Sequence, residues 1–89
     1  MNNYFTTTDG IRIPGITTEQ MVEVDRIAID ETGPNLYQMM ENTGRNLTLT
    51  IIDLIAEISS PSIIILAGTG GNGGGGICAA RHLLNRNYN

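Results

Sequence analysis

The stretch that decides the fold is residues 66–83, LAGTGGNGGGGICAARHL, where eight of the eleven residues after Leu66 are glycine or alanine. Glycine loses more backbone freedom on folding than any other residue, so such a run occurs in flexible linkers or where another group approaches the backbone closely. The run follows four apolar residues, IIIL at 63–66. That tetrad predicts a strand covered on both faces of a parallel sheet. Apolar residues at helical spacing from Ile77 onward predict a short helix after the glycines.

The glycines match a nucleotide-binding pattern in the context that gives it meaning. Residues 68–73, GTGGNG, fit G-x-G-x-x-G between a predicted strand and a predicted helix. Without Cβ atoms such a turn can be tight, its amides can face a pyrophosphate, and the following helix dipole favours the anion. The acidic residue of an ordinary dinucleotide-binding fold, about 20 residues later, would fall near residues 85–89, which contain none. A dehydrogenase fragment and a plain linker stay open as alternatives, the linker disfavoured by the apolar residues on both sides.

Two further helices are predicted upstream. Thr17 and Gln20 form the pattern of a capping box, and Gly33-Pro34 ends the helix that follows. A second helix begins at Asn35, carries an apolar stripe as far as Ile58, and stops at the Ser-Ser-Pro of residues 59–61. Gly44 interrupts that stripe at a cost of about 1 kcal/mol relative to alanine, so a close backbone approach is expected there. The polar residues 1–16 are expected to form an N-terminal arm.

Composition limits the classes of function. The chain has a net charge of -4, and its five basic residues are all arginine, which disfavours a nucleic-acid surface and a lysine-dependent P-loop. The apolar runs are too short to span a bilayer and no secretory signal is visible, so a cytoplasmic protein is expected. One cysteine and one histidine, Cys78 and His82, predict neither an internal disulfide nor a zinc cluster. Cys78 is expected to be a small buried hydrophobe, and His82 to have a structural role.

The order helix, helix, strand, glycine loop, helix indicates an α/β protein. A single strand leaves its backbone donors and acceptors without partners. The sequence therefore predicts that the chain is a fragment, or that it completes its sheet with another chain.

Three segments together resemble one family. The glycine stretch is similar to the strand-to-helix signature of the NAD(P)H-hydrate epimerases, the YjeF N-terminal domain family, whose pattern is approximately GxGNNGGDGxxAARHL. Residues 16–30, ITTEQMVEVDRIAID, resemble the first helix of that family, and residues 36–47, LYQMMENTGRNL, resemble its LMENAGRA motif. The resemblance covers about residues 16–84. Residues 17–89 are accordingly predicted to be the incomplete N-terminal part of a YjeF-type epimerase domain.

The resemblance implies a Rossmann-like three-layer α/β/α sandwich with a parallel sheet, of which this chain holds the N-terminal helices, the first strand and the following helix. It implies an isomerase that interconverts the R and S epimers of hydrated NADH and NADPH in cofactor repair, with a potassium ion at the site. Glu41, Asn42 and Arg45 form the polar part of the second motif, and the resemblance implies that this part packs against the glycine loop. The substrate-binding segment falls on Gly71, Asn72, Gly73, Gly74 and Gly75, and the potassium ligand on Asn72.

The sequence departs from the family pattern at two positions. Gly71 stands where the family has asparagine and Gly75 where it has aspartate, so polar side chains are lost while the amides remain. The catalytic aspartate of the family would lie outside this chain, which is expected to be inactive alone. A catalytically silent binding or assembly module is the alternative function. The expected partners are NAD(P)H hydrate as substrate and a homodimeric or complementing chain, without nucleic acid or membrane.

Overall fold

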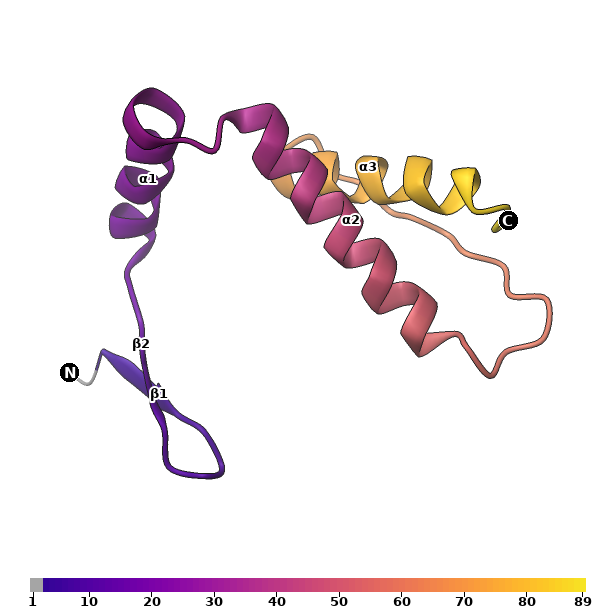
Figure 1. The fold of residues 1–89 in the computed structure, drawn as a ribbon, viewed down its shortest axis with the longest axis horizontal. Coiled ribbons are helices and arrows are strands. Elements are labelled where there is room, and N and C mark those ends of the chain that lie inside the picture. Colours follow the sequence, from indigo (N-terminus) through magenta and orange to yellow (C-terminus); the bar gives the residue numbers. More distant parts are fainter. Residues whose placement is uncertain (1–2) are drawn as a thin grey trace. The chain divides into compact units, whose positions relative to one another are not determined.

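The computed structural model describes residues 3–89, which divide into an N-terminal unit ending at Asn35 and a C-terminal unit from Leu36 to Asn89. The order of elements is two strands, an α-helix with a π-helical last turn, and two more α-helices (Figure 1). The chain therefore contains both helices and strands, and the coarse prediction of an α/β protein is confirmed.

The N-terminal unit begins with a β-hairpin. Strands β1 (Tyr4–Thr6) and β2 (Arg12–Pro14) pair antiparallel. The connection turns at Gly10, whose φ of 87° is a left-handed conformation that glycine adopts without steric cost. The Arg12 guanidinium stacks over the Tyr4 ring at 4.6 Å. This hairpin lies within the predicted arm of residues 1–16, whose first two residues lie outside the described part of the chain.

Helix α1 (Thr18–Ile27) begins at the predicted capping box. The Gln20 amide donates to Thr17 Oγ1 at 3.1 Å, and the Thr17 amide donates to Gln20 Oε1 at 2.8 Å. The helix continues as a π-helical turn (Ala28–Thr32) and stops at Gly33, where φ is 75°. Both predicted boundaries of this helix are confirmed.

The C-terminal unit is built on two helices that cross in contact, α2 (Leu36–Leu54) and α3 (Gly71–Asn85) (Figure 1). The side chains of Thr48, Ala79 and Leu83 are buried, and Thr48 of α2 contacts Ala79 of α3. Gly44 is buried in the same contact, and a Cβ there would lie 2.5 Å from Cys78 Cβ and 3.0 Å from the Cys78 carbonyl carbon. The close backbone approach predicted at Gly44 is thus confirmed.

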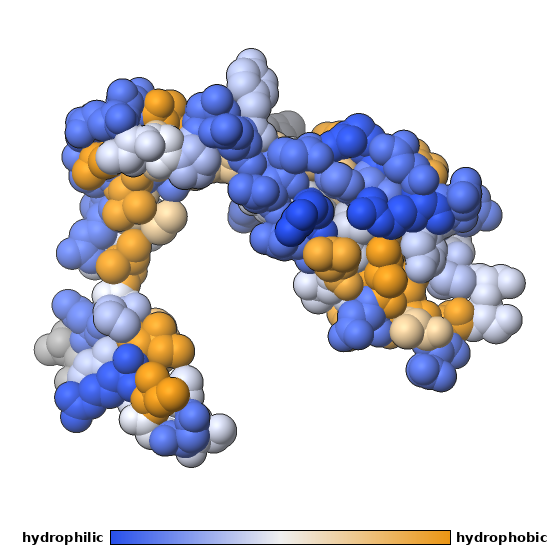
Figure 2. Space-filling model, viewed as in Figure 1, coloured by the Kyte–Doolittle hydropathy of each residue, from blue (hydrophilic) through white to orange (hydrophobic). Residues whose placement is uncertain are grey.

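Most of the apolar stripe of α2 remains at the surface. Within the described residues, Gly44 and Thr48 are the buried positions of this helix, while Leu36 is 50% exposed and Leu54 is 74% exposed. Orange hydrophobic residues are visible on the surface in Figure 2. The small core leaves large apolar area of the described residues exposed to solvent. No helix within residues 3–89 has the length and apolar character needed to cross a membrane.

The predicted strand at residues 63–66 does not form. This segment is irregular, and it has no ladder partner among residues 3–89, although the Ile63 amide donates to the Asn89 carbonyl at 2.8 Å. A strand requires a neighbour to satisfy its amides and carbonyls. The sheet that the structure does contain in its described part is the antiparallel pair β1–β2, so the predicted parallel sheet is not found there.

The predicted glycine loop is also shorter than expected, because α3 begins at Gly71 and includes most of the glycines. Gly70 has extended backbone angles, and the Gly74 amide donates to its carbonyl at 3.2 Å. Glycine has poor intrinsic helix propensity, but tertiary packing overrides propensity. The contacts of Gly73 and Gly75 described below supply that packing.

Candidate functional site

The glycine-rich first turns of α3 are exposed to solvent on one side and packed against other residues of the chain on the other side. The residues predicted to bind substrate are distributed over both: Gly71 and Asn72 are exposed, Gly73 and Gly75 are buried, and Gly74 is partly buried. Gly70, which precedes the helix, supplies no side-chain cap. The amides of a first helical turn have no partner within the helix, so this end of α3 presents backbone donors beside the Asn72 side chain.

Close packing on the buried side of this helix explains why several of these positions are glycine. A Cβ on Gly73 would lie 2.7 Å from the carbonyl carbon of Gly68, and a Cβ on Gly75 would lie 2.9 Å from Thr43 Cγ2. A Cβ on Gly71, in contrast, would meet no atom within 4 Å. The asparagine that the family pattern has at Gly71 would therefore fit sterically, whereas an aspartate at Gly75 would require Thr43 to move.

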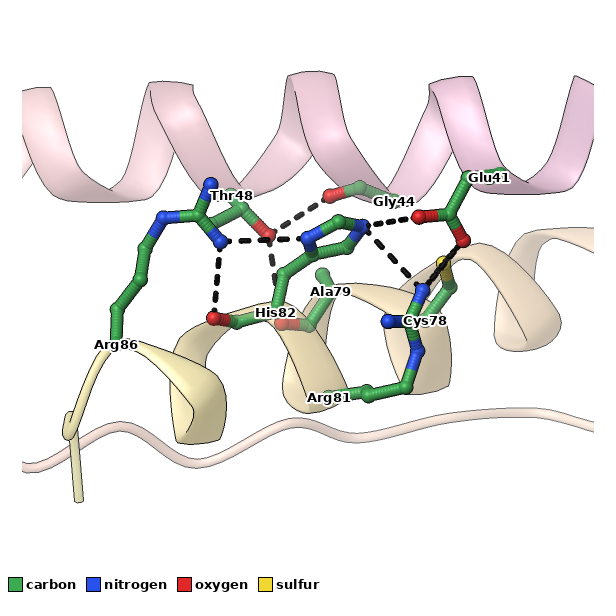
Figure 3. A network of polar contacts seen from close by, with 8 residues as sticks. All are labelled: Glu41, Gly44, Thr48, Cys78, Ala79, Arg81, His82 and Arg86. Carbon is green, nitrogen blue, oxygen red and sulfur yellow. Dashed lines mark hydrogen bonds and ion pairs between the residues drawn. The ribbon is translucent and has the colours of Figure 1, made fainter.

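A polar network lies farther along α3 and joins it to α2 (Figure 3). The Glu41 carboxylate projects from α2 and contacts three side chains of α3. It accepts from His82 Nε2 at 2.8 Å and from the Cys78 thiol at 3.4 Å, and it forms an ion pair with the Arg81 guanidinium. Glu41 thus packs beside the helical residues that follow the glycines, and it also lines a cavity together with Gly74 of the glycine-rich segment.

The charges in this network stabilise each other. The hydrogen bond from Arg81, and secondarily that from Cys78, lowers the pKa of the Glu41 carboxyl from its usual value. The same carboxylate raises the pKa of Arg81. His82 has a side chain only 12% exposed, and Arg86 Nη1 lies 3.3 Å from its Nδ1 and donates to its carbonyl at 3.1 Å.

Thr48 completes the helix contact from its buried position on α2. Its hydroxyl lies 2.8 Å from the Gly44 carbonyl and 3.3 Å from the Ala79 carbonyl on α3 (Figure 3). A buried hydroxyl with acceptors on both helices fixes their relative position.

Sequence reasoning missed the cluster formed by Glu41, Cys78 and His82, whose donor atoms all lie within 4.8 Å of one another. Cys78 is partly exposed and contacts a carboxylate, so the prediction of a buried hydrophobe was wrong. The sequence argument against a metal cluster counted only cysteine and histidine. It did not consider that a carboxylate from another helix, here Glu41, can lie beside them as a third potential metal ligand. The spacing of Cys78 and His82, four residues apart on one helix face, was the available signal.

Comparison with known families matches residues 36–89 to the family described as YjeF-related protein N-terminus. An NAD(P)H-hydrate epimerase of Dehalogenimonas lykanthroporepellens is 58% identical over 91% of this chain and 34% of its own length. An NAD(P)H-hydrate epimerase of Elusimicrobium minutum is 33% identical over 80% of this chain and 33% of its own length. A bifunctional NAD(P)H-hydrate repair enzyme Nnr of Salinibacter ruber is 35% identical over 80% of this chain and 13% of its own length.

The chain thus spans at most about a third of the length of these curated relatives. No solved structure matches it significantly. The family match covers α2, the irregular connection that follows it, and α3. These elements carry both the glycine-rich helix start and the Glu41 network. On this match, which covers more than half of its residues, the chain belongs to the YjeF-related protein N-terminus family.

Proposed function

We propose that the chain is the N-terminal part of an NAD(P)H-hydrate epimerase, an isomerase of metabolite repair whose complete domain interconverts the R and S epimers of hydrated NADH and NADPH. The 58% identity to an epimerase over 91% of the chain carries this proposal. The relatives are named for epimerisation or repair of the hydrates, so the alternative of a catalytically silent module is not favoured.

The start of α3 is proposed as the binding surface for the dinucleotide part of the substrate. Gly71, Asn72, Gly73, Gly74 and Gly75 form the first turns of this helix. Two features support the assignment. No side chain caps the amides of the first turn of α3, and the positive end of the helix dipole lies there. The exposed backbone at Gly71 lets a phosphate approach without meeting a side chain.

Potassium is proposed as the ion of this site, with Asn72 as its ligand from this chain. Asn72 is exposed in the first turn of α3, and its side-chain amide supplies one neutral oxygen of the kind that hard cations accept. One oxygen does not make a complete site, so the other ligands would come from outside the described residues. The ion would supply positive charge near the substrate, while the chain contributes amides and the Asn72 oxygen.

The complete domain is proposed to place residues 63–66 as a strand of the parallel sheet in a Rossmann-like three-layer sandwich. The exposure of Ile64 and Leu66, 83% and 93%, supports this, since both side chains are free to be covered by further elements. Residues 17–89 would then belong to one epimerase domain preceded by the N-terminal segment, with a homodimeric or complementing chain as a further candidate partner.

The test is the rate at which the full-length protein equilibrates R and S hydrates, compared with the spontaneous rate. The expected result is acceleration by the wild-type protein, and a weaker response to potassium in the Asn72→Ala variant. The Asn85→Ala variant is the matched control, because it removes the same kind of side-chain amide from the other, exposed end of α3. No acceleration by a folded full-length protein would refute the proposed function.

A further inference from the structure

The Glu41, Cys78 and His82 cluster has the donor atoms and the spacing of a transition-metal site. Cys78 and His82 lie one turn apart on α3, and Glu41 faces them from α2 (Figure 3). The separations are 2.8 Å between Glu41 Oε1 and His82 Nε2 and 3.4 Å between Glu41 Oε2 and Cys78 Sγ. Tetrahedral zinc with ordinary bond lengths requires ligand separations of about 3.3 to 3.6 Å. These two pairs are close to that range, and the donor atoms, which all lie within 4.8 Å of one another, would have to close the widest gap by side-chain rotation.

A positive charge already occupies the space between the three donor atoms. Arg81 Nη2 pairs with the Glu41 carboxylate and lies 3.7 Å from Cys78 Sγ and 3.4 Å from His82 Nε2. The three donors therefore hold a cation. This guanidinium is replaceable, because the Arg81 side chain is 51% exposed and an exposed ion pair contributes little to stability.

A second arginine controls which nitrogen of His82 can bind a metal. Arg86 Nη1 lies 3.3 Å from Nδ1 and can donate to it, which favours the neutral tautomer with its proton on Nε2. Coordination through Nε2 requires the proton on Nδ1 instead. Arg86 has an alternative acceptor in the His82 carbonyl at 3.1 Å, so it can release Nδ1 without losing both contacts.

The geometry points to a site for a borderline divalent transition metal, Zn²⁺ or Co²⁺, held by Glu41 Oε1 or Oε2, Cys78 Sγ and His82 Nε2 after Arg81 moves out. Mixed oxygen, sulfur and nitrogen ligands suit these metals and not Ca²⁺ or Mg²⁺. A cavity of about 360 Å³ lined in part by Glu41, Cys78 and Arg81 adjoins the cluster. It leaves room for a water or small ligand at a fourth coordination position. Asn72 is not one of the three ligands, and the metal site does not depend on the epimerase proposal, although Gly74 of the proposed dinucleotide-binding segment also lines the cavity.

The experiment is Co²⁺ titration of the reduced full chain, followed by thiolate-to-cobalt charge-transfer absorption, with Zn²⁺ competition and elemental analysis for stoichiometry. The expected result is one metal per chain, with the band lost in Cys78→Ser and weakened in Glu41→Gln and His82→Gln. Removing the competing cation in Arg81→Ala should tighten Co²⁺ binding by about tenfold or more, the size of effects of neighbouring groups on metal affinity.

Arg12→Ala is the matched control for net charge, because Arg12 is an exposed arginine of β2 in the N-terminal unit, whereas the cluster belongs to the C-terminal unit. Its Co²⁺ affinity should equal that of the wild type. Circular dichroism of each variant reports whether the helices remain folded. The proposal is overturned if neither the wild type nor folded Arg81→Ala gives the charge-transfer band. It is overturned equally by a band that persists unchanged in both Glu41→Gln and His82→Gln, since that result would mean binding by the thiol alone.

Discussion

Because Gly44 has no Cβ, α2 and α3 can pack closely at this position. Gly44 is buried against Cys78, and an added Cβ would overlap both the side chain and the backbone of that residue. The Cys78 Sγ could rotate away, but the Cys78 Cβ at 2.5 Å and carbonyl carbon at 3.0 Å could move only with α3. Glycine is therefore required here by packing, although it weakens α2 as an isolated helix.

Gly44→Ala should lower the free energy of unfolding. Overpacking costs about 1–3 kcal/mol, which exceeds the gain of at most about 1 kcal/mol from better helix propensity. Urea unfolding followed by circular dichroism measures the difference. Gly71→Ala is the matched control, since open space surrounds a Cβ there, and its stability should be unchanged or slightly higher.

Adding Cys78→Ala to Gly44→Ala should restore stability only in part, because the Cβ of residue 78 remains 2.5 Å from the new methyl group. Equal stability of Gly44→Ala and Gly71→Ala would contradict the close contact between the helices.

At the scale of elements, the α2–α3 pair is held by a small apolar core and by the polar contacts of Glu41. The sequence predicted both helices and a close backbone approach at Gly44, but it did not identify α3 as the partner of that approach. It could not place Glu41 against Cys78, Arg81 and His82. Which face of α2 meets which face of α3 depends on the crossing of the helices, and local periodicity does not determine that crossing.

Glu41 should make the stability of this helix pair depend on pH. Its pKa in the folded chain is lowered from 4.5, chiefly by the hydrogen bond from Arg81. The unfolded chain then binds the Glu41 proton more tightly, so stability rises with pH where this group titrates. The contribution is complete above the unfolded pKa and disappears as pH falls through the lowered folded pKa.

Urea unfolding of wild type and Glu41→Gln between pH 7 and pH 3 measures this contribution. The variant should be less stable at pH 7 and should lose less stability on acidification. Asp53→Asn, which neutralises an exposed carboxylate of the same helix, should retain the wild-type pH profile. Identical profiles for wild type and Glu41→Gln would show that the ion pair does not contribute.

At the scale of the whole molecule, sequence reasoning succeeded for local features and failed where partners were needed. The capping box at Thr17 and the helix end at Gly33 depend on neighbouring residues and were predicted correctly. The strand at 63–66 depends on a paired neighbour, and none is available within residues 3–89. The glycines were predicted as a loop because their pattern stands between a predicted strand and a predicted helix, whereas α3 begins at Gly71 and packs through Gly73 and Gly75.

The apolar segment 63–66 should therefore change from an irregular conformation to a strand when the remainder of a domain is present. In the 89-residue chain its amides, apart from the bond of Ile63 to Asn89, should exchange with solvent rapidly. In a longer protein of the length of the relatives, pairing with neighbouring strands should slow the exchange at residues 64–66 by at least about a hundredfold, because strand amides exchange only on local or global opening.

Hydrogen exchange followed by mass spectrometry on both lengths of chain tests this expectation. The α3 amide of Ala79, in the buried helix contact, serves as the internal control and should be protected in both. Rapid exchange at 64–66 in the folded longer protein would contradict a strand at this position. Slow exchange there, together with protection of α3, would mean that the irregular conformation of 63–66 results from missing sheet partners and not from its sequence.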